Sequence, residues 1–426
     1  MLMSIIPPPR MTKGIFHSFR FQLAFVLALG VAAPVLLAVG IPSAEQIRTG
    51  TFLNSVLMVA AAAVILICAI RRFALFPGTG VAPYILPTLA AIYAVFISFI
   101  MIFRIEYSVK IMVFGFLGTL VARYAVATLN VRGPQQIYYI VPGGRVKTIA
   151  QLMPLSSVTL SAPAAPELPH AAIIADLHHE HSPEWERFLA EAAISGTPVY
   201  HYKQAWESIT GQVHIEHLSE NGFGALIPSL SYRKIKRAAD ILLSTLLMPV
   251  ALAVLLAAAI MIKLDSRGPV FFCQKRMGYR GQMFLMYKLR TMRVTHNGDD
   301  RQASMTQSDD ERITRAGAFL RRTRIDELPQ IFNILRGEMS WIGPRPETVS
   351  LSEWYEKEIP FYRYRHIVRP GITGWAQVNQ GHVFSIDDTD SKLKYDFFYI
   401  KNISYWIDIF IVFKTVKVIL QGTGVK

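Results

Sequence analysis

Long runs without a charged side chain dominate the first 130 residues. Three such runs occupy residues 21–44, 49–70 and 73–103. About 20 apolar residues in a helix span the hydrocarbon core of a bilayer. Four transmembrane helices are therefore predicted within residues 1–130, near 21–41, 52–70, 82–103 and 110–129. The segment Pro77-Gly78-Thr79-Gly80 predicts a turn before the third helix. Arg123 interrupts the fourth and is expected to snorkel toward the interface.

Residues 131–230 show a different pattern, in which short apolar runs flank a helical segment. The runs at 136–142, 171–175 and 198–202 predict buried strands, and residues 185–193 have helical spacing. Strand, helix and strand in this order predict a small parallel sheet. The segment lacks the G-x-G-x-x-G that would bind a dinucleotide, so the prediction is a degenerate Rossmann-like α/β module.

Three histidines and a glutamate follow the second of these strands, at His178, His179, Glu180 and His181. Such side chains can bind a transition metal, which takes about four ligands in a tetrahedral site. The alternative is a solvated loop. The lack of helical i, i+4 pairing and of an evident fourth ligand favours the loop.

Near the start of residues 231–426 lies another uncharged run, 241–262, which would form a helix about 33 Å long. Pro249 lies in its middle, where a proline removes a hydrogen bond and kinks a helix. Basic residues flank the run on both sides, so a straight crossing would place one basic cluster outside, against the charge rule. The pattern predicts a re-entrant helix at about 238–263, and a fifth span is the alternative.

The remainder of this region mixes strands and helices, which predicts an α+β catalytic domain. One strand is indicated by apolar residues that alternate with polar ones, at Phe284, Met286 and Leu289. A turn at Gly278–Gly281 precedes it. Lys288 and Arg290 then share one face, where two cations suit a diphosphate, or they form a solvated basic edge. Apolar spacing over Ile407–Leu420 predicts a helix that lies in the membrane interface or packs in the core.

Two adjacent carboxylates, Asp326 and Glu327, follow a cluster of arginines and precede Pro329. Nearby guanidinium groups favour the ionised form of a carboxylate, and an ionised aspartate can attack phosphorus and form an acyl phosphate. Adjacent carboxylates can also hold Mg²⁺ together with substrate phosphates. The alternative is a structural role, because acidic residues near a helix start stabilise it through capping and the helix dipole.

Two segments rich in glycine and proline come next. Gly343-Pro344-Arg345-Pro346 holds Arg345 between two prolines, which suits a pre-organised phosphate ligand or a tight structural turn. Residues 369–381 combine turn glycines with an aromatic side chain and amides. This composition indicates either a loop that wraps a base or a sugar, or a plain surface loop.

The composition agrees with a membrane protein, since 52% of residues are hydrophobic and only 17% are charged. This excludes a disordered chain, a coiled coil and a nucleic-acid-binding tail. Lys and Arg exceed Asp and Glu by 44 to 30, a net charge of +14 that suits anionic lipid or phosphates. Positive charges near the N-terminus, such as Arg10 and Lys13, and after the fourth span place both regions in the cytoplasm. Cys68 and Cys273 do not indicate a disulfide framework.

At these clusters, residues 231–426 closely resemble the bacterial sugar transferase family, the monotopic phosphoglycosyl transferases. The motifs occur in one order: Lys236-Arg237…Asp240, the proline-broken helix, Lys288-Leu-Arg-Thr-Met, Asp326-Glu-Leu-Pro-Gln, Gly343-Pro-Arg-Pro and Arg369-Pro-Gly-Ile-Thr-Gly-Trp-Ala-Gln-Val-Asn. One departure is Met248, where the family often has Ser before the helix proline. The preceding spans and α/β module look like the large polytopic members that begin exopolysaccharide or O-antigen synthesis.

The resemblance implies transfer of a hexose 1-phosphate from a UDP-sugar to undecaprenyl phosphate, with release of UMP. It implies a covalent phospho-sugar on Asp326, a dyad of Asp326 and Glu327 that holds Mg²⁺, and phosphate contacts from Lys288, Arg321 and Arg345. Glucose or galactose is the preferred sugar, with an N-acetylhexosamine as the alternative. The implied location is the bacterial inner membrane, with the catalytic domain in the cytoplasm. Expected partners are both substrates and membrane lipid, without nucleic acid, and a second copy of the chain is a further candidate.

Two functions of other classes compete with this one. A transporter or flippase of lipid-linked sugars would need charged residues that face a cavity among the spans, and such residues are scarce. A non-catalytic scaffold for polysaccharide assembly would tolerate replacement of both Asp326 and Glu327.

Overall fold

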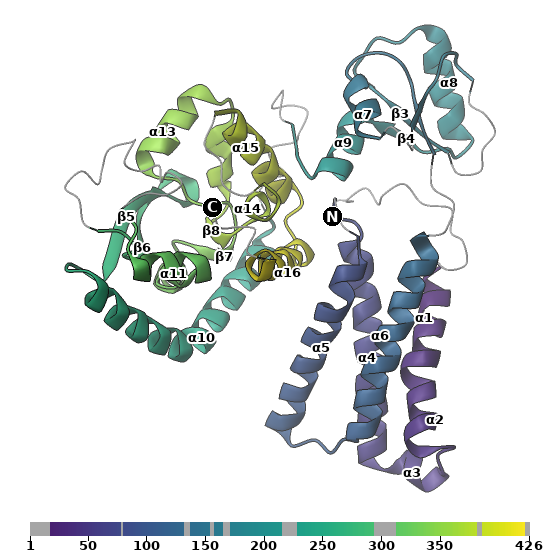
Figure 1. Ribbon diagram of the computed structural model, residues 1–426. Coiled ribbons are helices and arrows are strands. Elements are labelled where there is room, and N and C mark those ends of the chain that lie inside the picture. Colours follow the sequence, from purple (N-terminus) through teal and green to yellow (C-terminus); the bar gives the residue numbers. More distant parts are fainter. Residues whose placement is uncertain are drawn as a thin grey trace. The chain divides into compact units, whose positions relative to one another are not determined.

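The computed structural model describes residues 18–77, 80–131, 137–153, 157–164, 171–214, 228–293, 312–380 and 386–421. The chain divides into two compact units, Met1–Gly211 and Gln212–Lys426 (Figure 1). Several sequence predictions lie outside the described residues: the charges of Arg10 and Lys13, the centre of the turn at Gly78-Thr79, and the last residue of the segment 369–381. The predicted division into three domains, with boundaries near 130 and 230, stays a prediction.

The four predicted N-terminal helices are present. The first helix is continuous but contains a π-helical turn, so it carries three labels: α1 (Phe19–Leu27), η2 (Ala28–Ala32) and α2 (Ala33–Val39). The other three are α4 (Gly50–Phe73), α5 (Ala82–Phe103) and α6 (Val109–Val131), and the short α3 (Ala44–Arg48) precedes α4. Together with a later helix in the second unit, five helices among the described residues are long and apolar enough to cross a membrane.

Small residues let the first and fourth of these helices pack closely. A Cβ on Gly30 of η2 would lie 2.4 Å from Thr119 Oγ1, and one on Gly118 would lie 2.2 Å from the Leu29 carbonyl oxygen. Nearby, Arg123 is 3% exposed and donates to Gln22 Oε1 at 3.3 Å. Arg123 therefore lies inside the bundle, where Gln22 of α1 accepts one of its hydrogen bonds while its Nε has no partner among the described residues, and its snorkelling to the interface stays a prediction.

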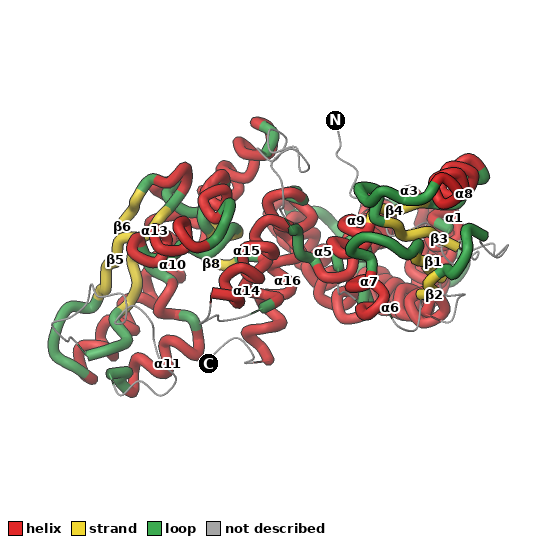
Figure 2. Tube along the Cα trace, turned by 90° about the horizontal axis from the view of Figure 1, so that it is seen from above, coloured by secondary structure: helices red, strands yellow, loops and turns green. Residues whose placement is uncertain are grey.

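The α/β module is a parallel four-stranded sheet in the order β2-β1-β3-β4 (Figure 2). Its elements in chain order are β1 (Ile137–Ile140), α7 (Lys147–Leu152), β2 (Ser157–Thr159), β3 (Ala171–Ala175), α8 (Pro183–Ile194), β4 (Val199–His201) and α9 (Tyr202–Thr210). Ile173 packs toward α8 on one face, and its neighbour Ile174 packs toward α7 and α9 on the other. Helices thus cover both faces, as the alternation of strand side chains requires.

The second unit begins with the long helix α10 (Leu230–Asp265), which contains Pro249. Figure 1 shows α10 as two arms that meet at an angle. A proline inside a helix is the usual cause of such a kink, so the bend survives with Met248 before the proline.

A mixed α/β arrangement follows α10. The antiparallel hairpin of β5 (Phe271–Met277) and β6 (Met283–Leu289) is joined by the predicted glycine turn, with Gly281 at φ +72° (Figure 2). The other elements are α11 (Arg315–Thr323), η5 (Ile325–Glu327), α12 (Gln330–Arg336), β7 (Ser340–Ile342), α13 (Val349–Glu358), η6 (Tyr362–Ile367), β8 (Gly371–Thr373), α14 (Trp375–Asn379), α15 (Ile386–Lys401) and α16 (Tyr405–Gln421).

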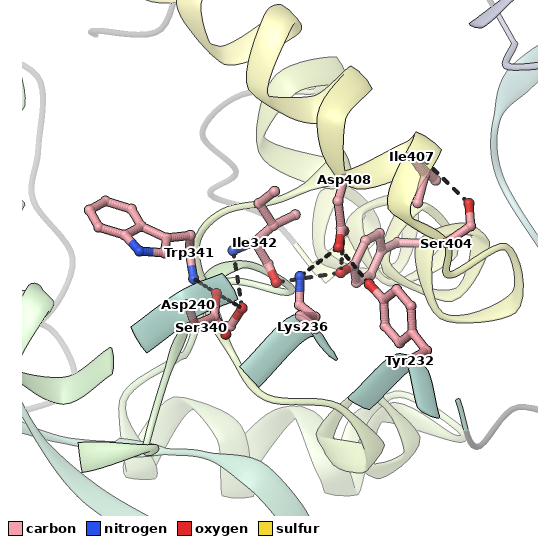
Figure 3. Close-up of polar contacts among 10 residues, drawn as sticks. Tyr232, Lys236, Asp240, Ser340, Trp341, Ile342, Ser404, Ile407 and Asp408 are labelled. Carbon is pink, nitrogen blue, oxygen red and sulfur yellow. Dashed lines mark hydrogen bonds and ion pairs between the residues drawn. The ribbon is translucent and has the colours of Figure 1, made fainter. Parts of the chain in front are cut away.

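The first arm of α10 is fixed to this unit by polar side chains four residues apart, which share one helix face. Tyr232 and Lys236 both donate to Asp408 Oδ2 of α16, at 2.5 and 2.7 Å (Figure 3). One turn further, Asp240 Oδ1 accepts from Ser340 Oγ at 3.1 Å. The motif Lys236-Arg237…Asp240 therefore anchors the helix.

The second arm of α10 is held by apolar contacts with β6 and α11. Leu255, Ala258 and Ile262 are buried against Leu289 and Leu320. Other apolar side chains of the same helix have no cover in the described structure and are strongly exposed: Leu242, Leu246, Val250, Leu256 and Leu264.

Helix α16 packs in the core along one face, as one of its two predicted alternatives requires, and its position in a membrane interface stays a prediction. Ile407 and Phe410 are fully buried, and Phe410 lies against Trp375 with ring centroids 6.0 Å apart. Ile409 and Val416 are 44% and 48% exposed. One apolar face therefore packs in the core, and the other is available to a membrane interface.

Candidate active site

The two adjacent carboxylates lie in a short turn between two helices. Helix α11 ends where Arg324 adopts the left-handed conformation, at φ +58°. The 3₁₀ turn η5 then carries Asp326 and Glu327, and Pro329 leads into α12. Both carboxylates are buried, at 8% and 6% exposure. They are not simple caps of an exposed helix start.

Glu327 is the centre of an ion-pair cluster. Its Oε1 accepts from Arg345 Nη2 at 2.8 Å and from Lys288 Nζ at 3.1 Å, and Arg324 Nη1 lies 3.9 Å away. Burial alone would raise the pKa of Glu327, but Arg345 and Lys288 outweigh it and hold the pKa well below its usual range. Glu327 is therefore ionised at neutral pH.

Asp326 has a different environment. Its Oδ1 is buried and has no hydrogen-bond partner among the described residues. Burial, and then the charge of Glu327, raise the pKa of Asp326 above its ordinary value. The expectation that nearby guanidinium groups favour the ionised form of a carboxylate fits Glu327, whereas at Asp326 the opposing effects of burial and of the Glu327 charge are larger than those of the cations.

The segment around Arg345 is held by a second layer of buried charges. The Arg345 carbonyl oxygen accepts from Arg365 Nη2 at 2.9 Å, and the same Nη2 pairs with Asp396 Oδ2 at 2.8 Å. Arg276 donates to the Pro346 carbonyl oxygen at 3.1 Å. These contacts fix the backbone on both sides of Arg345.

The two segments rich in glycine and proline contact each other directly. Gly343 N donates to the Thr373 carbonyl oxygen and Gly371 N to that of Pro344, each at 2.9 Å. Trp375 is 1% exposed and stacks on Phe398 with centroids 5.4 Å apart. It is therefore a core residue, and both predicted roles for its segment, a loop that wraps a ligand and a plain surface loop, are wrong at this side chain.

Four of the five predicted site residues thus come together: Asp326, Glu327, Lys288 and Arg345. The described hydrogen bond of the fifth, Arg321, goes from Nε to Thr291 Oγ1 at 2.9 Å. The prediction that Lys288 and Arg290 converge is wrong. Arg290 is buried and donates to the carbonyl oxygens of Ser266 and Arg267, just after α10.

Sequence reasoning did not assign a site role to Arg276 or Arg324. Burial lowers the pKa of Arg276 to about 10, and the charges of Glu347, Arg345 and Glu327 act on the same group. Arg324 lies beside Glu327 because of its left-handed backbone, which is unusual for arginine. The position of Arg276 depends on contacts with distant segments such as Pro346, whereas Arg324 is only three residues from Glu327 and belongs to the arginine cluster that precedes the dyad.

The donor chemistry of the dyad fits a hard divalent cation. Mg²⁺ takes one or two carboxylate ligands and substrate phosphates. Asp326 Oδ1 is a buried carboxylate oxygen to which no described residue donates a hydrogen bond. Asp326 and Glu327 are therefore the residues that would hold Mg²⁺ in this unit.

Comparisons with known proteins identify the family of this chain. The sequence pattern of bacterial sugar transferases matches residues 231–422. Over 356 residues the chain is 41% identical to a UDP-N-acetylgalactosamine-undecaprenyl-phosphate N-acetylgalactosaminephosphotransferase of Aeromonas hydrophila, which covers 83% of this chain and 84% of that protein.

Two UDP-glucose:undecaprenyl-phosphate glucose-1-phosphate transferases match a shorter part. The protein of Escherichia coli (strain K12) is 44% identical, over 43% of this chain and 40% of its own length. The protein of Xanthomonas campestris pv. campestris is 47% identical, over 40% of this chain and 36% of its own. With the near full-length relative and the matching catalytic region, the chain belongs to the bacterial sugar transferase family.

Proposed function

We propose that this protein transfers a sugar 1-phosphate from a UDP-sugar to undecaprenyl phosphate and releases UMP. The observation that supports this most strongly is the asymmetric dyad, in which Glu327 is ion-paired and Asp326 Oδ1 has no partner in the described structure. A carboxylate oxygen without a competing donor is available as a nucleophile.

In the first step a carboxylate oxygen of Asp326 attacks the phosphorus that bears the sugar. A new P–O bond forms, the P–O bond to UMP breaks, and UMP leaves with the bridging oxygen. In the second step a phosphate oxygen of undecaprenyl phosphate attacks the same phosphorus. This releases the Asp326 carboxylate and forms a lipid diphosphate-linked sugar.

The cations beside the dyad offset the charge of the phosphates. Lys288 and Arg345 already neutralise Glu327, and both are rigidly placed to contact a diphosphate in addition. Arg321 is assigned the same role by resemblance. Mg²⁺ held by Asp326 and Glu327 would supply further charge neutralisation on the phosphate oxygens.

The lipid substrate requires an active site at the membrane face. Both arms of α10 contact the same compact unit, through Asp240 to Ser340 and through Asp265 Oδ2 to Ala316 N at 3.0 Å. A straight crossing would separate the two arms by a bilayer, so we infer that the kinked helix enters one leaflet and returns. The second unit is then cytoplasmic, and the exposed apolar side chains around the bend contact lipid.

This topology is testable with the two cysteines, both of which are free and exposed. In a Cys68→Ser background, a membrane-impermeant maleimide should label Cys273 only after the inner membrane is permeabilised. A cysteine in place of Ser43, in the loop between α2 and α3, should react in intact spheroplasts and serves as the control. Labelling of Cys273 in intact spheroplasts would contradict the re-entrant arrangement.

For the sugar we propose an N-acetylhexosamine, and this replaces the preference for glucose or galactose. The relative that aligns along most of this chain is named for N-acetylgalactosamine. The relatives named for glucose align along 43% and 40% of it. An alignment of 356 residues is longer than the second unit and so extends into the N-terminal unit, and this extent supports the N-acetylated sugar.

The decisive experiment offers UDP-GalNAc, UDP-GlcNAc, UDP-glucose and UDP-galactose with undecaprenyl phosphate to the purified protein, and measures UMP. We expect UMP with an N-acetylhexosamine donor and a radiolabelled sugar-phosphate adduct on the protein before lipid is added. Asp326→Asn should abolish both. Asp390→Asn, an exposed carboxylate of the same unit, should retain both, and full activity of Asp326→Asn would overturn the nucleophile assignment.

A further inference from the structure

The carboxyl edge of the parallel sheet gathers residues that the transferase chemistry does not use. Strands β3 and β4 are neighbours in register, with Ala175 opposite His201. Asp176 follows β3 directly, and His178 lies two residues later. One ligand atom from each of Asp176, His178 and His201 lies within 4.8 Å of the other two.

This edge is where open α/β sheets bind their ligands. The strand order β2-β1-β3-β4 reverses direction between β1 and β3, and ligands occupy the crevice beyond the carboxyl ends of strands at such a reversal. Gly143 and Gly144 follow β1 there. A Cβ on Gly144 would lie 2.2 Å from Asp176 Oδ2, and one on Gly143 would lie 2.5 Å from the His179 ring. The backbone after β1 therefore approaches the cluster without a side chain.

Hydrogen bonds orient the buried carboxylate. Asp176 Oδ2 accepts from Arg145 N at 3.1 Å, and Oδ1 accepts from His178 N at 3.2 Å. His181 Nε2 lies 2.9 Å from the Asp176 carbonyl oxygen. Each carboxylate oxygen has a further lone pair, so backbone donors fix Asp176 without exhausting its capacity as a ligand.

The two histidines face each other through ring nitrogens. His178 Nδ1 and His201 Nε2 are 2.7 Å apart, so one ring donates a hydrogen bond to the other. A cation can replace a shared proton between two nitrogen ligands. In a tetrahedral zinc site with bonds of about 2.0 Å, the nitrogens lie about 3.3 Å apart, so the rings need to separate by about 0.6 Å. Binding at His201 Nε2 also puts the ring proton on Nδ1, so Nδ1 can no longer accept the long 3.5 Å hydrogen bond from Lys203 N.

We propose that Asp176, His178 and His201 bind one Zn²⁺ ion, with the fourth position open to water or an added donor. Two imidazole nitrogens and one carboxylate oxygen suit zinc and related transition metals, whereas Mg²⁺ prefers oxygen ligands alone. The ion joins the loop after β3 to the end of β4. This site lies in the first unit and is independent of the dyad in the second.

The test uses the full-length protein in detergent, stripped with chelator and kept in millimolar Mg²⁺ to occupy carboxylate sites. Zn²⁺ is titrated in competition with a chromophoric chelator. We expect one tight equivalent for the wild type. His178→Ala and His201→Ala should each weaken it by more than about 100-fold, since loss of even an outer partner of a ligand costs about 10–100-fold. His179→Ala is the matched control, because it removes a neighbouring imidazole outside the ligand set, and should bind like the wild type.

Co²⁺ provides a second measurement, since nitrogen ligation changes its visible absorption. We expect such bands in the wild type and in His179→Ala, and not in His201→Ala. Thermal unfolding without metal should be the same for all variants, which separates loss of a ligand from loss of the fold. Zinc binding by the wild type no tighter than by a His178→Ala/His201→Ala double variant would overturn the proposal. An equal loss in His179→Ala would overturn the ligand set.

Discussion

The contact between α10 and α16 allows a quantitative test of how the long helix α10 is held. Asp408 of α16 accepts three hydrogen bonds: Tyr232 and Lys236 donate to Oδ2, and the Tyr399 hydroxyl donates to Oδ1 at 2.9 Å (Figure 3). Asp408→Asn keeps the shape of this side chain but removes its charge. Because the amide is neutral, Lys236 loses its counter-ion. The amide nitrogen also cannot accept the hydrogen bonds that Tyr232 and Lys236 donate to the carboxylate.

The expected loss follows from the burial of the pair. The Lys236 and Asp408 side chains are 17% and 12% exposed, so both ions are largely desolvated. Removal of one partner of a buried ion pair costs about 3–5 kcal/mol, and partial access of water to Lys236 favours the lower end. A loss of about 3 kcal/mol in a unit of this size lowers the unfolding temperature by about 6–12 °C.

Tryptophan fluorescence during thermal unfolding of the detergent-solubilised protein measures this loss. Trp375 is a suitable reporter, since it is buried between Phe398 and Phe410 and senses the docking of α16. Asp390→Asn is the control. Its pair with Lys394, at 2.5 Å and four residues apart on one helix, is only partly buried, with Asp390 43% exposed, and helical pairs of this spacing contribute about 0.3–0.5 kcal/mol.

A double variant separates the lost charge partner from lost packing. Lys236→Met together with Asp408→Asn removes both ions, so no unpaired charge stays buried, and the double variant should be more stable than Asp408→Asn alone. If Asp408→Asn unfolds within the range of the Asp390→Asn control, the pair does not hold α10 and the reasoning fails.

Three further outcomes are expected at the site. Burial and the charge of Glu327 raise the pKa of Asp326, so kcat/KM should fall as the pH drops through that pKa. Glu327→Gln removes the like charge, so the acid limb of the pH profile of its residual activity should move to lower pH. An acid limb at the same or a higher pH would refute the coupling between the two carboxylates. Arg345→Lys loses the planar guanidinium that forms an ion pair with Glu327 at 2.8 Å and should reduce the rate of UMP release by about tenfold or more. The control Arg336→Lys, on an exposed helix end, should change that rate little. Gly371→Ala places a Cβ 2.1 Å from Gly343 N and should lower the unfolding temperature markedly, whereas Gly50→Ala meets only Asn54 at 3.9 Å and should not.

Periodicity predicts those elements whose burial is dictated by their own side chains. The apolar runs gave the spans, and three buried strands of the α/β module were predicted close to their bounds. The fourth strand, β2 (Ser157–Thr159), has two exposed residues of three, so it has no hydrophobic pattern and exists through its pairing with β1. Arg123 shows the same limit, because its fate depends on Gln22, which lies 101 positions away in the sequence.

The dyad shows why a motif identifies a site before it identifies roles. Asp326 and Glu327 are adjacent and follow the same arginines, so their local sequence cannot distinguish them. The distinction comes from Lys288 and Arg345, which lie 39 and 18 positions away from Glu327 and both reach the same oxygen of Glu327. Although Lys288, Arg324 and Arg345 also lower the pKa of Asp326, burial and the charge of Glu327 outweigh them, and Asp326 Oδ1 has no donor in the described structure. An oxygen kept free of hydrogen bonds beside an ionised neighbour is costly for folding, and that cost is understandable if the oxygen is needed to form a bond to phosphorus.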